Sequence, residues 1–164
     1  MSTPFLPVRR NAFFSLRRIA WIALVAGGWS AVGCGGGAEE EVPCQGAECE
    51  CSGSGDCQLV CGDTCDLGCI GSGKCDFTCG ANCEAACPGS GECRVEVGDD
   101  SLVACTGSGG CDVVCAGDCT VECPGSGECV AQCQSGFDCA ITRCDEDVKS
   151  CANGVQVCNG SCPS

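Results

Sequence analysis

The 164-residue chain contains no histidine and no tyrosine, and only 4% of its residues are aromatic. Without histidine it cannot build a Ser-His-Asp triad, a Cys-His nucleophile or a His-ligated zinc site. Its cysteines never occur as Cys-x-x-Cys, the spacing of thiol–disulfide oxidoreductases. Spacing alone identifies no pair of carboxylates for hydrolysis either. We therefore expect no enzymatic activity and no cofactor.

Basic residues are also scarce once the N-terminal segment is set aside. Residues 34–164 hold four, against 22 acidic residues, so their formal charge is −18. The four are Lys74, Arg94, Arg143 and Lys149. Because nucleic-acid binding depends on neutralising phosphates with Lys and Arg, this composition argues against a nucleic-acid partner. An acidic surface also keeps a protein soluble and repels its neighbours.

Cysteine and glycine are abundant instead, with 25 and 26 residues. Cysteine above about 8–10% in a short exported chain indicates a disulfide scaffold. Cysteine-rich acidic chains can resemble metallothioneins, but those rely on dense Cys-x-Cys and Cys-x-x-Cys spacings. Here Cys49-Glu50-Cys51 is the only Cys-x-Cys. An exported chain also meets oxidising conditions, so disulfides are expected rather than metal thiolates.

Residues 1–33 have the features of an export signal. Arg9, Arg10, Arg17 and Arg18 precede an apolar run over residues 19–32, which is shorter than the about 20 residues of a membrane span. The run ends in Ala31-Val32-Gly33-Cys34, which resembles the lipobox of bacterial lipoproteins. The resemblance implies cleavage before Cys34 and a diacylated cysteine that anchors the chain in a membrane. The alternative is an ordinary secretory signal cut near Gly33, which would release a secreted protein.

Two further observations agree with lipidation of Cys34. Residues 34–43 form a Gly- and Glu-rich tether, and the 24 cysteines that remain form an even number, enough for twelve pairs. Gly35 follows Cys34, so the Asp of the inner-membrane retention signal is missing and the outer membrane is the expected location. The membrane is thus an expected partner, reached through at least two acyl chains.

The body of the chain repeats every 18 residues. The spacing Cys-x5-Cys-x3-Cys-x3-Cys-x3-Cys closes on itself over residues 51–133, and x-Gly-Ser-Gly follows the first cysteine of each copy. The copies begin at Cys51, Cys69, Cys87, Cys105 and Cys123. Cysteines four residues apart fit either one face of a helix or the alternation of a strand.

The third repeat favours strands, because it lacks the two middle cysteines and shows the preference of its other residues. Residues 94–97 and 101–104 are rich in strand formers and flank Gly98-Asp99-Asp100, which has the composition of a turn. Each repeat then supplies two strands and two turns. The inward positions hold cysteines and one apolar pair per repeat, namely Leu59 with Leu67, Phe77 with Ala85, Val95 with Val103, and Val113 with Val121.

Units of this kind bury their inner faces by stacking, which predicts an all-β, disulfide-stapled β-solenoid with 18-residue coils. In outline the pattern resembles the disulfide-filled β-helices of insect antifreeze proteins, although their 12-residue coils and Thr-x-Thr ladders are absent. The resemblance implies an architecture and not an activity. A meander of Cys-closed β-hairpins is the alternative.

Val97 and Ser101 replace two cysteines together, which is expected if those two positions pair within one coil. We therefore predict Cys61–Cys65, Cys79–Cys83 and Cys115–Cys119 beside one turn. The Gly-Ser-Gly turns would be closed by Cys51–Cys57, Cys69–Cys75, Cys87–Cys93, Cys105–Cys111 and Cys123–Cys129. A shifted phase such as Cys57–Cys69 has nearly the same geometry and stays open. Cys133 and Cys139 complete the set of repeat cysteines expected in disulfides.

The ends of the repeat differ from its middle. Residues 44–50, with Cys44 and Cys49, are expected to cap the N-terminal end. After Cys133 the next cysteine comes two residues late, so residues 134–164 are expected to form an irregular cap. That cap contains Cys144, Cys151, Cys158 and Cys162.

The function expected from these features is that of a lipid-anchored, extracytoplasmic structural or interaction module of a bacterial cell envelope. The alternative is an acidic, divalent-cation-binding surface protein, since turn residues Asp63, Asp99, Asp100 and Asp118 could hold Ca²⁺. An 18-residue coil is twice the period of the calcium-binding RTX β-roll, although the Gly-Gly-x-Gly element of that family is missing. The sequence names no protein partner.

Overall fold

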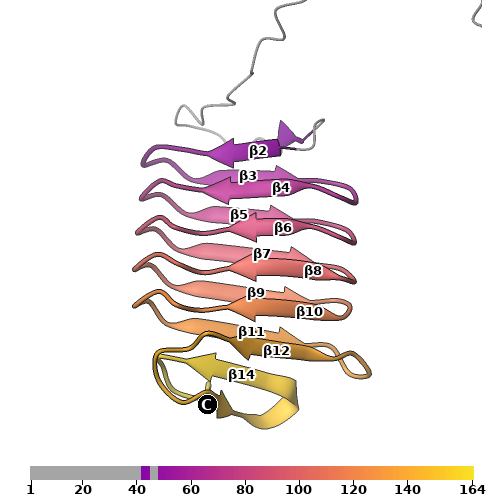
Figure 1. Cartoon of the computed structure of the whole chain (residues 1–164). Helices are drawn as coiled ribbons and strands as arrows, with labels where there is room; N and C mark the ends of the chain where they lie inside the picture. The colour runs from indigo at the N-terminus through magenta and orange to yellow at the C-terminus, as the bar shows by residue number, and fades with distance from the viewer. Residues whose placement is uncertain (1–41, 45–47) are drawn as a thin grey trace, which may run out of the picture.

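The computed structural model describes residues 42–44 and 48–164, which form a stack of coils between two β-sheets (Figure 1). Sheet A has eight strands in the order β1-β3-β5-β7-β9-β11-β14-β13, and sheet B has six in the order β12-β10-β8-β6-β4-β2. Consecutive strands of the repeat alternate between the sheets, so every 18-residue coil gives one strand to each. Within the described residues, no helix has the length and apolar character needed to cross a membrane.

The strands are short, mostly four or five residues, because a turn follows each of them. Sheet A contains β1 (Val42–Pro43), β3 (Cys57–Val60), β5 (Cys75–Thr78), β7 (Cys93–Val97), β9 (Cys111–Cys115), β11 (Cys129–Cys133), β13 (Lys149–Ser150) and β14 (Val155–Cys158). Sheet B contains β2 (Glu48–Cys51), β4 (Asp66–Cys69), β6 (Glu84–Ala86), β8 (Ser101–Ala104), β10 (Cys119–Glu122) and β12 (Cys139–Thr142). A 3₁₀ turn, Ala152–Gly154, precedes β14.

The repeat strands pair in parallel and in register with the same strand of the next coil. Cys57 lies opposite Cys75, Cys75 opposite Cys93, and Cys93 opposite Cys111. Sheet B follows the same rule, with Leu67 opposite Ala85 and Ala85 opposite Val103. This pairing confirms the β-solenoid with 18-residue coils. It excludes the meander of hairpins, whose neighbouring strands would run antiparallel.

The core is a narrow slot between the sheets, filled by one apolar residue per strand and by cysteines. Leu59, Phe77, Val95 and Val113 lie in one column of sheet A, and each is at most 1% exposed. Residues on either side of each inward position are more exposed, so the strands show the two-residue alternation expected from the sequence. Stacking the coils therefore buries faces that a single coil would leave open.

The Gly-Ser-Gly turns lie along the left edge of the stack in Figure 1, one directly beneath another. A Cβ on Gly71 would collide with the carbonyl oxygen of Gly53, and a Cβ on Gly91 with that of Gly73. The same collision recurs for the glycines of the next two turns. From the second motif onward, both glycines are therefore needed because backbone stacks on backbone at this edge.

The stack continues past the break in the period. Residues 134–138 absorb the additional length in a wider turn, and β12 pairs with β10 in register, Cys139 opposite Cys119. β14 then pairs antiparallel with β11 and brings β13 beside it, which covers the C-terminal end of sheet A. Sheet B therefore runs one strand beyond the regular 18-residue spacing.

Side-chain amides cover the remaining backbone at this end. Gln156 accepts a hydrogen bond from the Ile141 N–H (2.9 Å) and donates to the Cys139 carbonyl (3.1 Å), as a further parallel strand would. Asn159 donates to the carbonyl oxygens of Gly125 (2.9 Å) and Gly127 (3.3 Å) in the last Gly-Ser-Gly turn. The C-terminal end of the stack is thus closed against strand addition.

Candidate functional site

Disulfides follow both edges of the stack in two columns. The Gly-Ser-Gly column closes the Gly-Ser-Gly turns with Cys51–Cys57, Cys69–Cys75, Cys87–Cys93, Cys105–Cys111 and Cys123–Cys129. The opposite column closes the other turns with Cys44–Cys49, Cys61–Cys65, Cys79–Cys83, Cys115–Cys119 and Cys133–Cys139. The Cα atoms of these pairs are 6.0–6.4 Å apart, within the usual range for a disulfide.

The structure therefore brings together all eight pairs expected from the repeat, in the within-coil phase and not the shifted phase Cys57–Cys69. It also joins Cys133 to Cys139, for which the spacing named no partner. Two disulfides bind the C-terminal cap, Cys144–Cys158 and Cys151–Cys162. Cys158 lies opposite Cys129, so the first of these continues the Gly-Ser-Gly column.

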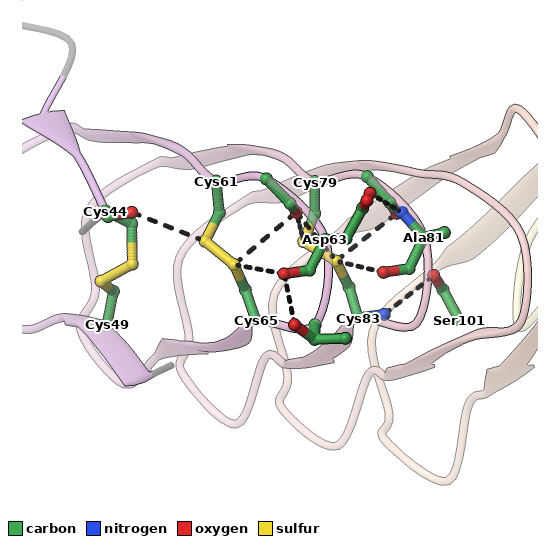
Figure 2. The surroundings of a disulfide bond; sticks show 12 residues. Cys44, Cys49, Cys61, Asp63, Cys65, Cys79, Ala81, Cys83 and Ser101 are labelled. Atoms are coloured by element: carbon green, nitrogen blue, oxygen red, sulfur yellow. Dashed lines mark hydrogen bonds between the residues drawn. A yellow bond between two sulfur atoms is a disulfide. The ribbon is translucent and has the colours of Figure 1, made fainter. Parts of the chain in front are cut away.

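One coil interrupts the opposite column. Val97 and Ser101 occupy the cysteine positions of the third coil, and they are 0% and 3% exposed. Figure 2 shows the Cys83 N–H donating to Ser101 Oγ at 3.1 Å, beside the row of disulfides formed by Cys44–Cys49, Cys61–Cys65 and Cys79–Cys83. Valine fills the volume of one sulfur, and serine satisfies a backbone donor that would otherwise be buried without a partner.

The structure does not describe the predicted lipidation site. Cys34, the signal segment 1–33 and residues 34–41 of the tether lie outside the described residues. The last two residues of the tether, Val42 and Pro43, form β1 and pair with Leu59 and Val60 of β3.

The turn carboxylates, considered above as calcium ligands, mostly bind the chain itself. Asp63 accepts a hydrogen bond from the Ala81 N–H of the next coil (2.9 Å), and Asp99 accepts one from Asp118 (3.0 Å). Asp118 in turn accepts one from the Asp138 N–H at 2.8 Å. These aspartates therefore connect consecutive coils, and a cation would have to compete with backbone donors for their oxygens.

A shallow groove beside sheet B gathers three other carboxylates and the fourth turn carboxylate, Asp100. Glu48, Asp66 and Glu84 lie in register on β2, β4 and β6, so their side chains follow one another at about the 4.8 Å spacing of neighbouring strands. Asp100 lines the groove from the next turn. Like charges directly opposite each other destabilise a sheet, so this column costs stability unless a cation or a basic group screens it. Sequence reasoning named Asp100 as a possible calcium ligand but did not single out Glu48, Asp66 or Glu84.

The groove is bordered by three residues with left-handed backbone. Thr64, Asn82 and Asp100 have φ values of 60°, 57° and 55° at equivalent positions of three coils. Asn and Asp tolerate this region, whereas a β-branched residue such as threonine is strained there.

Comparison with protein-family models, with curated proteins and with solved structures found no match for this chain. The fold and the two disulfide columns therefore define the molecule only as a cysteine-rich, disulfide-stapled β-solenoid.

Proposed function

We propose that the chain is a lipid-anchored, extracytoplasmic structural or interaction module of a bacterial cell envelope, with no catalytic activity. The lipid would be carried by Cys34, at the end of a segment that resembles a lipoprotein signal. The disulfide-stapled stack would then be held at the outer membrane by the tether, with the membrane as its first partner.

The observation that carries the proposal is the complete use of cysteine in the described part of the chain. The 24 cysteines there form twelve disulfides, so none of them is left to pair with Cys34. Cys34 is also the only cysteine next to the lipobox-like residues Ala31, Val32 and Gly33. A single unpaired thiol would be unusual in an exported disulfide scaffold, whereas a thioether-linked lipid removes it.

The geometry of the stack supports a role in display or spacing. The described chain begins at one end of the stack, and the C-terminal cap lies at the other (Figure 1). An anchor at Cys34 would therefore place the cap away from the membrane. The cap exposes Phe137 (41%) and Val148 (37%), and Val148 directly follows Asp145, Glu146 and Asp147 in the sequence, so the cap offers a partner both apolar and acidic side chains.

Metabolic labelling with a palmitate analogue tests the anchor directly. The wild-type protein should incorporate the label and sediment with membranes, and Cys34→Ala should do neither. Cys34→Ala should still form twelve disulfides, which distinguishes loss of the anchor from failure to fold. Label on Cys34→Ala, or wild type found only in the soluble fraction, would overturn the proposal.

A second candidate function, divalent-cation binding at the surface, is favoured by the carboxylate column Glu48, Asp66 and Glu84. Oxygen ligands of this kind suit Ca²⁺. A calcium titration of thermal stability separates the two functions, because an interaction module has no reason to be stabilised by the ion.

A further inference from the structure

Two neighbouring disulfides of the opposite column bring sulfur atoms of different coils together. The Sγ atoms of Cys61, Cys65 and Cys79 all lie within 4.8 Å of one another, although Cys79 is disulfide-bonded to Cys83. Figure 2 shows these two disulfides side by side. All four cysteines are buried: Cys61 is 8% exposed, Cys65 7%, Cys79 5% and Cys83 2%.

The backbone holds these cysteines on adjacent coils independently of the sulfur–sulfur bonds. The Cys61 N–H donates to the Thr78 carbonyl (2.9 Å), and the Cys79 N–H donates to the Glu96 carbonyl (2.8 Å). The turn between them is tied by the Gly80 N–H donating to the Gly62 carbonyl (3.0 Å). With the two disulfides open, these backbone bonds would still hold Cys61 and Cys79 on adjacent coils.

Four thiolates in this arrangement match the ligand set of a thiophilic metal ion. Zinc and similar d¹⁰ ions take four cysteine sulfurs in a tetrahedron with bonds of about 2.3 Å, which places the sulfurs about 3.8 Å apart. Three of the sulfurs here already lie within 4.8 Å of one another. Cys83 lies outside that group of three but is bonded to Cys79, so a small movement of its side chain would supply the fourth. Soft thiolate ligands select Zn²⁺, Cd²⁺ or Cu⁺ over oxygen-preferring ions such as Ca²⁺.

We propose that Cys61, Cys65, Cys79 and Cys83 form a tetrathiolate site for a thiophilic d¹⁰ cation when their two disulfides are reduced. Each disulfide takes up two electrons and two protons from a phosphine or thiol reductant, giving two thiols. A phosphine is oxidised to its oxide with oxygen from water, and a thiol reductant to its disulfide. One divalent ion then binds four sulfurs and releases four protons.

The same arrangement recurs at two other steps of the stack. Sulfur atoms of Cys115, Cys119 and Cys139 meet on the far side of the interruption at Val97 and Ser101. Those of Cys105, Cys111 and Cys129 meet in the Gly-Ser-Gly column. Within the described residues Cys87–Cys93 belongs to no such group, which makes it the matched control.

No spacing in the sequence indicates these sites, because each of them combines cysteines of two coils. A metallothionein-like pattern needs closely spaced cysteines, and here the spacing from Cys61 to Cys79 is one full coil. Stacking alone brings them together. The proposal goes beyond the envelope function, which concerns the oxidised protein.

Limited reduction in the presence of Cd²⁺ alone tests the proposal on the wild-type protein. The oxidised protein receives two equivalents of tris(2-carboxyethyl)phosphine per chain with CdCl₂ and is then alkylated, stripped of metal and labelled a second time. Because bound metal stabilises the reduced thiolates, the disulfides of the sulfur groups should be reduced in preference to the others. The second label should therefore fall on Cys61, Cys65, Cys79 and Cys83, or on the groups around Cys139 and Cys129. Label on Cys87 and Cys93 at equal frequency, or no retained cadmium, would overturn the proposal.

Two double variants identify which cysteines bind the cadmium ion. Cys61→Ser/Cys65→Ser should retain about one cadmium ion fewer per chain than wild type, and Cys87→Ser/Cys93→Ser should retain as many as wild type. The circular dichroism spectrum of the cadmium-loaded protein should keep its β-sheet signal. Equal cadmium binding by the oxidised protein would assign the ion to carboxylates, and cadmium held after loss of the β-sheet signal would assign it to an unfolded chain. Either result contradicts the proposal.

Discussion

The second and third coils, residues 69–86 and 87–104, follow the same path, but only the second closes both of its turns with disulfides. In the second coil Cys79 bonds Cys83, whereas the third coil has Val97 and Ser101 at these positions. The strands beside the disulfide-free turn are longer, since β7 and β8 have five and four residues against four and three in β5 and β6.

This difference separates the interactions that determine the path of the chain from the disulfide, which adds stability to it. The third coil keeps its register with both neighbours through backbone hydrogen bonds, stacked glycines and the contact of Ser101 with Cys83. The disulfide of the second coil therefore adds stability to a turn whose path other interactions already define. Four experiments on the stack follow, from the largest expected effect on stability to the smallest.

Replacing a stacked glycine should have the largest effect, because both coils depend on it. In Gly91→Ala the new Cβ would collide with the carbonyl oxygen of Gly73, and we expect a loss of about 1–3 kcal/mol in the free energy of unfolding. Gly110→Ala is the control, since no heavy atom lies within 4 Å of its Cβ position and its change should stay within about 0.5 kcal/mol. Denaturant unfolding followed by circular dichroism measures both. Equal losses would show that stacking does not require glycine.

Exchanging the residue pairs at this turn between the two coils should have the next largest effect on the free energy of unfolding. Cys79→Val/Cys83→Ser copies the third coil into the second and should lose about 2 kcal/mol, the chain-entropy contribution of so short a loop. Val97→Cys/Ser101→Cys adds a disulfide to the third coil and should gain up to about the same amount. Both variants should keep the β-sheet signal in circular dichroism. Loss of that signal in the first would mean that the disulfide directs the chain as well as stabilising it.

Replacing the residue with left-handed backbone in the first coil should have a smaller effect on the free energy of unfolding. Thr64 has a φ of 60°, where the next two coils have Asn82 and Asp100. Thr64→Asn should raise the free energy of unfolding by about 1 kcal/mol, because asparagine is less strained there. The reciprocal variant Asn82→Thr should lower it by a similar amount. Unchanged midpoints in both would show that the threonine carries no strain.

Calcium should have no effect. The turn aspartates already accept backbone hydrogen bonds from the next coil, and Glu48, Asp66 and Glu84 are exposed, so dissolved salt already screens their repulsion. We therefore expect an unchanged melting temperature up to millimolar Ca²⁺. A rise that depends on calcium concentration, and that Glu84→Gln abolishes, would instead assign a cation site to the groove formed with Glu48 and Asp66.

Much of the fold follows from the sequence because the repeat makes each coil a copy of its neighbours. The 18-residue period, the Gly-Ser-Gly turns and the alternation of inward residues predict the strands and the stack. The joint replacement of two cysteines by Val97 and Ser101 pointed to pairing within one coil, which is also the pairing in the structure.

The features that escaped prediction all depend on distances between coils. Three such features are the stacking of glycine on glycine, the closure of β12 by Gln156 and the sulfur groups around Cys79. They join residues 14 to 18 positions apart that only stacking makes neighbours. The carboxylate column Glu48, Asp66 and Glu84 likewise becomes a groove only when β2, β4 and β6 are placed side by side.

The central claim is a fully oxidised stack on a lipid-bearing Cys34, and the intact mass of the purified protein tests it most directly. The protein is denatured without reductant, alkylated and weighed. We predict no added label on the 24 cysteines of the stack and the mass of a chain that begins at an acylated Cys34. Labelling of most of these cysteines would contradict the disulfide scaffold, and an unmodified Cys34 would contradict the anchor.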